Sequence, residues 1–275
     1  AKVPIAEVAE VVIGRRWTDE DLLSHLHSVV EEKSINIMVP FVDGAVGVAA
    51  RYRDLYGDVF TPVSHVLLCD SMFDKIIAAA VFEKARIPAP ATYHRGKPEF
   101  PLIAKPRNGS ASKGIRIIEN ATDFRAVISP PDKYLIQEYI PHRQEITVDC
   151  YVTRRSEITC ISPRLRLEVV GGEVSRTVTI DAPDVVEVAR RAIVRTGLTG
   201  AVTVQFIRDL DADGRLLIME VNPRLGGGAV CTVHAGGDIP GMIIDEALGR
   251  DVNEASALQS GTEIVRYMQE VVFHN

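Results

Sequence analysis

Short continuous apolar runs alternate with helically spaced apolar residues over the first seventy positions of the chain. Leucine and valine recur every three to four residues at 22–33, behind a threonine and three acidic residues, which predicts a helix. Two apolar runs at 35–42 and 63–69 flank a second helical pattern at 45–56 and are typical of strands buried on both faces. This order predicts a parallel βαβ unit, and we expect a further strand and helix to precede it in a complete domain.

Beyond residue 70 the pattern predicts more strands than helices. The predicted strands lie at 102–105, 114–118, 134–140, 146–152, 158–163, 165–170, 201–208 and 216–221, and the predicted helices at 71–85, 121–127 and 184–196. A glycine pair at 171–172 and an Asp-Ala-Asp-Gly turn at 211–214 each close a hairpin. We therefore predict an α/β protein with an N-terminal domain at 1–70 and a larger domain at 71–275.

Composition narrows the class of protein. Apolar residues make up 46% and charged residues 25% of the 275 positions, as in ordinary soluble globular chains. The 31 basic and 37 acidic residues give a net charge of −6 without a basic cluster, so we expect no nucleic-acid and no membrane partner. No apolar stretch reaches the roughly 20 residues that cross a bilayer. The four cysteines are scattered, which predicts neither a zinc site nor a disulfide framework and favours a cytoplasmic protein.

A loop of small residues follows Lys105 at the end of a predicted strand. The segment 106–114, PRNGSASKG, holds two glycines and two serines and leads into the next strand. Small residues let backbone N–H groups approach a phosphate, and serine hydroxyls add donors. No helix pattern or G-K-[S/T] motif follows, so this is not a Walker loop. A phosphate-binding loop and a plain hairpin connection fit the segment equally well.

Three polar side chains interrupt the last predicted hairpin. Strand alternation places Glu220 and Asn222 on one face, and Gln205 lies on the facing strand. Carboxylate and amide oxygens suit Mg²⁺ held between a protein and substrate phosphates. The alternative is that polar residues at strand ends simply meet solvent.

Six segments in order resemble the ATP-grasp superfamily and, within it, a single half of the large subunit of carbamoyl-phosphate synthetase. The matching segments are CDSMFDK at 69–75, LIAKPRNGSASKG at 102–114, IQEYI at 136–140, QEITVD at 144–149, VQF at 204–206 and IMEVNPRLGGG at 218–228. The resemblance covers roughly residues 35–250. It implies a pre-ATP-grasp domain at 1–70 and a two-lobed ATP-grasp domain, with lobe 71–138 carrying the loop 106–114 and lobe 139–275 carrying the metal site.

The resemblance implies a nucleotide site for ATP. Lys75 and Lys105 would contact the phosphates, and the loop would cover them through its small residues, among them Gly109, Ser110, Ser112 and Gly114. Glu138 and Ile140 would offer backbone groups to the adenine edge, with Tyr139 between them, and Glu145 would bind the ribose hydroxyls.

The resemblance also implies a metal site and catalytic residues. Gln205, Glu220 and Asn222 would hold one or two Mg²⁺ ions, and Arg224 would neutralise the phosphoryl group in transfer. Lys105 and Asn222 would be catalytic residues together with Arg224. Glutamine at 205 matches the carbamoyl-phosphate-synthetase pattern, whereas many relatives carry a glutamate there.

The resemblance implies a ligase acting on two small molecules. ATP would phosphorylate a carboxylate, an amine would attack the acyl phosphate, and ADP and phosphate would leave. Two alternatives remain: a carbamoyl-phosphate-synthetase-like enzyme acting on bicarbonate or carbamate, and an ATP-binding regulatory protein without turnover. The arginines at 164 and 166 would either clamp a substrate carboxylate or pair with acidic residues on the surface, and a homodimer is left open.

Overall fold

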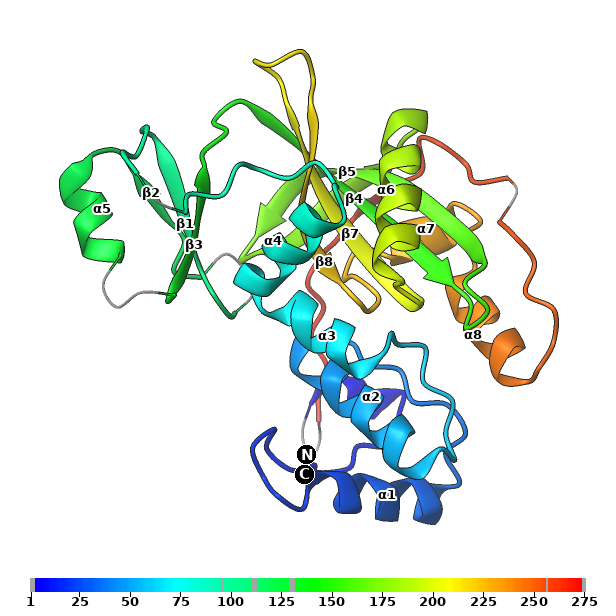
Figure 1. The fold of residues 1–275 in the computed structure, drawn as a ribbon. Coiled ribbons are helices and arrows are strands. Elements are labelled where there is room, and N and C mark those ends of the chain that lie inside the picture. Colours follow the sequence, from blue (N-terminus) through cyan, green and yellow to red (C-terminus); the bar gives the residue numbers. More distant parts are fainter. Residues whose placement is uncertain (1–2, 95, 110–112, 129–131, 256, 274–275) are drawn as a thin grey trace.

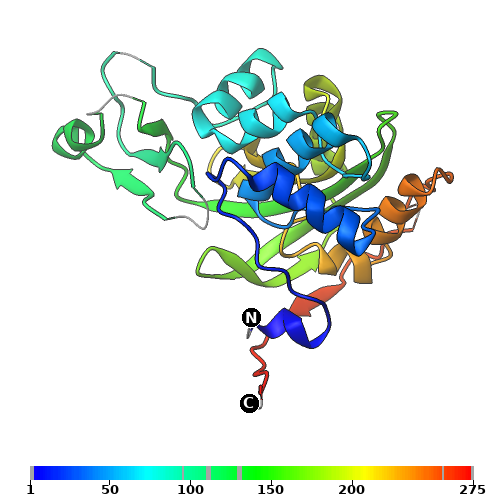
Figure 2. The same cartoon turned by 90° about the horizontal axis from the view of Figure 1, so that it is seen from below.

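The computed structural model describes residues 3–94, 96–109, 113–128, 132–255 and 257–273. Figure 1 shows three parts that follow one another along the chain: an N-terminal helical unit, a small three-stranded sheet that projects to one side, and a large six-stranded sheet flanked by helices. Figure 2, from below, again shows the small sheet extending away from the rest of the chain. No helix in the described ranges is both long and apolar enough to span a membrane.

The N-terminal unit differs from the βαβ prediction. After a short 3₁₀ turn at Pro4–Glu7, it contains helices α1 (Leu22–Lys33), α2 (Asp43–Tyr56) and α3 (Val66–Phe73). The two predicted helices are confirmed. The strand predicted at 63–69 is wrong, because most of it forms α3, and the strand predicted at 35–42 contributes only one isolated parallel bridge, between Ile37 and Phe60.

Local chemistry explains why 63–69 becomes helical. The His65 side chain caps α3 by accepting a hydrogen bond from the backbone N–H of Leu67 at 3.3 Å. Cys69 and Met72, three residues apart, are buried, whereas Leu67 is 70% exposed. A strand buried on both faces would have buried Leu67 as well, so a continuous apolar run does not by itself distinguish the two structures.

The predicted helix at 71–85 is two helices. Asp74 has extended backbone angles, and its side chain accepts hydrogen bonds from the N–H groups of Ile76 and Ile77. This cap ends α3 and starts α4 (Lys75–Lys84). Lys75 is thereby placed on the first turn of a helix.

The small sheet carries the glycine and serine loop. Strands β1 (Leu102–Pro106), β2 (Arg116–Ile118) and β3 (Tyr134–Glu138) are antiparallel in the order β2-β1-β3. Helix α5 (Ala121–Val127) covers one face, where Phe124 packs against the strands. The strands and the helix predicted for this region are confirmed.

The large sheet has the order β8-β7-β4-β5-β6-β9, and all neighbouring strands are antiparallel. Its strands are β4 (Arg143–Val152), β5 (Ile158–Val170), β6 (Glu173–Thr179), β7 (Gly200–Asp209), β8 (Leu216–Asn222) and β9 (Glu263–Val265). The two strands predicted at 158–163 and 165–170 are the single strand β5. Strands β6 and β9 and the helices α7 (Val230–His234) and α8 (Ile239–Ala247) were not predicted.

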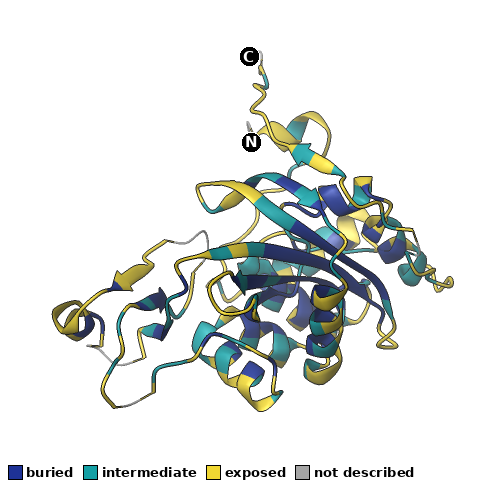
Figure 3. Cartoon of the chain, turned by 90° about the horizontal axis from the view of Figure 1, so that it is seen from above, coloured by how far each residue is buried: buried dark blue, intermediate teal, exposed yellow. Residues whose placement is uncertain are grey.

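The two faces of the large sheet differ in chemistry. On one face Val148, Val204 and Phe206 pack against α4 and α6 (Pro183–Thr196), and full burial of each such side chain contributes about 1.5–3 kcal/mol. Figure 3 shows this buried central region of the sheet in dark blue. Strand alternation directs the intervening polar residues to the opposite face. That polar face holds the candidate site.

Candidate active site

A cavity of about 320 Å³ is lined by β1, the start of α4 and the polar face of the large sheet. It brings together most residues predicted from the sequence: Lys75, Lys105, Gly109, Glu138, Tyr139, Ile140, Glu145, Gln205, Glu220, Asn222 and Arg224. Gly114 does not line it, and Ser110 and Ser112 lie outside the described residues. Segments far apart in sequence thus meet in one cavity.

Lys75 is tied to the first part of the loop. Its backbone N–H donates to the carbonyl of Arg107 at 2.9 Å, and its Nζ donates to the carbonyl of Gly109 at 2.6 Å. The capping residue Asp74 also forms an ion pair with Arg107 at 2.5 Å. Gly109 has φ of +120°, a backbone angle that favours glycine. These contacts hold the described start of the loop against α4.

Lys105 is a buried cation. Its side chain projects from β1, the residue is only 7% exposed, and Nζ donates to Gln137 Oε1 at 3.0 Å. Burial lowers the pKa of Lys105 to about 8, although the nearby charge of Glu220 acts in the opposite direction. An anionic ligand that enters the cavity would compensate the buried positive charge of Lys105.

The segment from Glu138 to Ile140 is held in place at the edge of the cavity. The carboxylate of Glu138 accepts a hydrogen bond from the N–H of Ala91 at 2.8 Å and pairs with Arg215 at 2.7 Å. The N–H of Glu138 donates to the carbonyl of Ala91 at 2.9 Å. The backbone beside the cavity is therefore already ordered.

The polar face aligns the residues of the predicted metal site. Gln205 on β7 pairs directly with Glu220 on β8, and Thr203 pairs with Asn222. Thr147 on β4 lies opposite Gln205 on its other side. Because alternate residues of a strand share a face, all these side chains project to the same side of the sheet.

Glu220 and Asn222 present oxygen atoms of the kind that bind magnesium. Burial raises the pKa of Glu220, and the cations Lys75, Lys105 and Arg224 oppose this shift. Neither side chain makes a hydrogen bond to another described residue. The described residues include no group of three or more His, Cys, Asp and Glu suited to a metal. One carboxylate with an amide oxygen still fits a hard cation that takes its other ligands from phosphate and water.

Gln205 has a protein partner instead. Its Oε1 accepts a hydrogen bond from Nη1 of Arg166 on β5 at 3.0 Å. Of the residues predicted to bind the metal, Gln205 alone has its oxygen engaged by a described cationic side chain.

Asp43 is a cavity residue that the sequence interpretation missed. It is the first residue of α2, and its carboxylate forms an ion pair with Arg224, which also donates to the carbonyl of Leu225 at 3.0 Å. The sequence showed Asp43-Gly44 only as a turn after an apolar run. The contact spans 181 positions, so no local pattern could reveal it.

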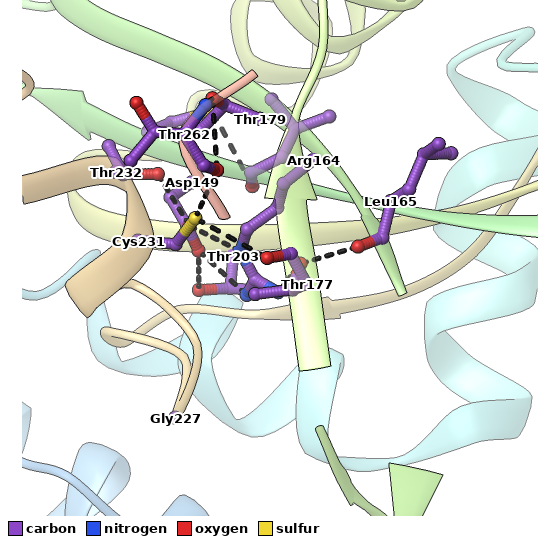
Figure 4. Close-up of polar contacts among 12 residues, drawn as sticks. Asp149, Arg164, Leu165, Thr177, Thr179, Thr203, Gly227, Cys231, Thr232 and Thr262 are labelled. Atoms are coloured by element: carbon purple, nitrogen blue, oxygen red, sulfur yellow. Dashed lines mark hydrogen bonds and ion pairs between the residues drawn. The ribbon is translucent and has the colours of Figure 1, made fainter. Parts of the chain in front are cut away.

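A buried ion pair stands at one end of the cavity. Arg164 donates from Nε to Asp149 at 2.8 Å, and Asp149 also accepts from the hydroxyl groups of Thr232 and Thr203 (Figure 4). The side chains of Arg164 and Asp149 are only 3% and 1% exposed. Arg164 therefore pairs with an acidic residue, as one of the two alternatives stated, although that residue is buried rather than on the surface.

The glycine turn at 226–228 packs against this end of the cavity. A Cβ atom on Gly228 would lie 2.5 Å from Nη1 of Arg164, and one on Gly226 would lie 2.9 Å from the hydroxyl oxygen of Thr203. Side chains at these positions would displace the ion pair, which explains the need for glycine here.

Comparison with known proteins shows similar chains. A curated D-alanine–D-alanine ligase from Petrotoga mobilis is 35% identical over 98 residues, which are 32% of this chain and 32% of the ligase. A biotin carboxylase complex from Campylobacter jejuni has a TM-score of 0.75 at 17% identity, covering 91% of this chain and 63% of that one. An L-amino acid ligase from Bacillus licheniformis has a TM-score of 0.70 at 15% identity, covering 90% and 64%. The chain thus spans a third of the curated relative and less than two thirds of these structures.

The structural similarities at these identities show the fold. The narrower resemblance to half of the carbamoyl-phosphate synthetase large subunit stays a prediction. A family model described as ATP-grasp in the biosynthetic pathway with Ter operon matches residues 131–271, which is more than half of the chain. The chain therefore belongs to this family of ATP-grasp proteins.

Proposed function

We propose that the chain is an ATP-dependent ligase of the cytoplasm that joins a small carboxylate to an amine. The γ-phosphoryl group of ATP passes to the carboxylate, and the amine attacks the acyl phosphate, so that an amide, ADP and phosphate are formed. The observation that carries the proposal is the cavity in which Lys75 and Lys105 lie with Glu220 and Asn222. Phosphoryl transfer depends mainly on positioning and charge, which such a cavity can supply.

The domains divide this work. In the proposal residues 1–70 form a pre-ATP-grasp domain, and the ATP-grasp lobes 71–138 and 139–275 hold ATP between them. The adenine lies along 138–140, the ribose lies at Glu145, and the phosphates lie between the two lysines and Gly109. The ordered backbone at Glu138 supports this placement.

Glu220 and Asn222 would hold magnesium in this proposal, and the ion would supply positive charge to the phosphate groups. Arg224 would add charge beside the phosphoryl group. Asp43 orients Arg224, since the two form an ion pair at the wall of the cavity.

The carboxylate and amine classes are supported by the names of two similar proteins, a D-alanine–D-alanine ligase and an L-amino acid ligase. Both names describe bond formation between small molecules that carry carboxylate and amino groups.

An ADP-release assay tests the proposal. Hydroxylamine first replaces the unknown amine, so that each carboxylate of a panel can be screened alone and an acyl phosphate is trapped as a hydroxamate. Amines are then tested with the carboxylates that respond. We expect ADP and hydroxamate in equal amounts with a subset of carboxylates. A chain that binds ATP yet releases no ADP with any carboxylate would instead be a regulatory ATP-binding protein.

A further inference from the structure

Arg166 reaches across the polar face of the large sheet. It lies on β5, while its hydrogen-bond partner Gln205 lies on β7, and β4 runs between them. Because neighbouring strands are about 4.8 Å apart, the two side chains together span about 10 Å above the sheet. Both residues line the cavity, and the side chain of Arg166 is 12% exposed. The guanidinium group therefore lies over the sheet in the cavity wall.

Several contacts fix this guanidinium group. Nη1 donates to Gln205 at 3.0 Å and Nη2 donates to the carbonyl of Gly172 at 3.4 Å, whereas the buried Nε has no hydrogen-bond partner among the described residues and lies 3.8 Å from the carboxylate of Glu145. A long side chain that is already held by two hydrogen bonds loses little further freedom when a ligand binds.

The hydrogen bond determines how the Gln205 amide points. A guanidinium group only donates hydrogen bonds, so the amide oxygen must face Arg166 and the amide nitrogen must face away. An amide nitrogen is a donor and does not bind a cation. The Gln205 oxygen, already engaged by a cationic side chain, is thereby a poorer ligand for a metal ion shared with its neighbour Glu220.

The charges around Arg166 also disfavour a second metal ion. Glu145 pairs with Arg143 at 3.3 Å as well as with Arg166, so one carboxylate serves two guanidinium groups. The charge of Arg164, by contrast, is matched by Asp149. One positive charge beside Gln205 is thus left for an anionic ligand, and it repels a divalent cation at the same place.

We propose that Gln205 is a positioning residue that holds Arg166, and that Arg166 takes the place of a second metal ion. The inference rests on the proposed function. The site then binds one divalent cation, at Glu220 and Asn222, and the Arg166 guanidinium contacts the phosphate groups from the other side. This differs from the metal ligation that the sequence resemblance implies for Gln205.

Counting manganese ions tests the inference without measuring turnover. The full chain is titrated with Mn²⁺ in the presence of the imido analogue of ATP, and bound Mn²⁺ is measured by electron paramagnetic resonance. We expect one tightly bound Mn²⁺ per nucleotide. Gln205→Leu should keep that ion with a dissociation constant within about twofold, whereas Glu220→Gln should weaken it about tenfold or more.

Two outcomes would overturn the inference in different ways. Two spin-coupled Mn²⁺ ions per nucleotide, reduced to one by Gln205→Leu, would make Gln205 a ligand and leave the proposed function intact. Failure of the chain to bind the nucleotide at any Mn²⁺ concentration would overturn the proposed function and this inference with it.

A nucleotide series separates phosphate binding from a structural role. Arg166→Met should weaken binding of the ATP analogue about tenfold or more and leave the affinity for AMP nearly unchanged, because AMP lacks the distal phosphates. Gln205→Leu should act in the same direction, and the double variant should add little to Arg166→Met since the two residues act as a unit. Equal losses of affinity for AMP and for the ATP analogue would show that Arg166 only supports the fold.

Discussion

Replacing the buried Lys105 by methionine should stabilise the ligand-free protein while weakening ATP binding. Methionine keeps an unbranched apolar side chain of similar length and removes the charge. Burial lowers the pKa of Lys105 from 10.5 to about 8, and each pKa unit corresponds to 1.36 kcal/mol. The charged lysine therefore lowers the free energy of unfolding by about 3 kcal/mol at neutral pH. Loss of the hydrogen bond to Gln137 offsets about 1 kcal/mol, which leaves a net gain of about 2 kcal/mol.

The sign of the pH dependence follows from proton binding. Between pH 8 and 10.5 the unfolded chain holds the Lys105 proton and the folded chain releases it, so the contribution of Lys105 to stability rises with pH across this window. Below pH 8 Lys105 is protonated in both states, and burial of its charge lowers the free energy of unfolding by the full amount. The stability gap between Lys105→Met and the wild type should thus be widest at pH 7 and close towards pH 10.5.

Thermal unfolding at pH 7 and pH 10 measures this gap. A gain of about 2 kcal/mol corresponds to a rise of about 4–8 °C in Tm for a chain of this size at pH 7. The exposed Lys97→Met is the matched control and should leave Tm nearly unchanged at both values. A Lys105→Met protein that melts below the wild type at pH 7 would refute the account of Lys105 as a buried charge. Calorimetry near pH 8 should also detect proton uptake by the wild type on ATP binding, which the variant should lack.

Further variants test other parts of the site. Glu220→Gln should lower magnesium-dependent turnover by about two orders of magnitude, and a high magnesium concentration should restore part of the turnover. The affinity for nucleotide without metal should change little. Near-normal ADP production by this variant would contradict the metal assignment. Asp149→Asn leaves Arg164 buried without its counter-charge and should lower the free energy of unfolding by about 3–5 kcal/mol, and an unchanged denaturation midpoint would contradict that burial. Gly228→Ala should destabilise the protein by about 1–3 kcal/mol because its Cβ would crowd Arg164, whereas alanine at Gly14, which has open space around it and no positive φ, should cost much less; equal losses at the two positions would argue against the packing at 226–228.

The sequence predicted those parts of the molecule that depend on local pattern. Strand alternation placed Glu220 and Asn222 on one face, and the observed pairing with Gln205 and Thr203 agrees with it. Helix α5 begins and ends at the predicted residues. The strand predicted at 63–69 is wrong because the length and apolarity of this run fit a helix and a buried strand equally well. In addition, the histidine that caps α3 is not a common capping residue.

Long-range contacts explain what the sequence could not predict. Asp43 was interpreted as part of a turn, yet the fold brings it to Arg224, and only the packing of α2 beside the cavity makes that pair. Arg166 and Gln205 are 39 positions apart on strands that are not neighbours. Periodicity assigns each to a face of its strand but does not specify which side chains join across an intervening strand.

The same contacts decide how the cavity distributes charge. Asp43 neutralises part of Arg224, Asp149 neutralises Arg164, and Glu145 is shared between Arg143 and Arg166. Among the cations that line the cavity, Lys75, Lys105 and Lys113 form no ion pair with a described residue, and Arg143 and Arg166 share one carboxylate. All of these line one cavity, in which Glu173 and Glu220 are the carboxylates without an ion pair to a described residue. An anion that brings its own divalent cation, as a magnesium nucleotide does, satisfies both sets of charges at once, and that is the physical basis for proposing ATP as the ligand of this site.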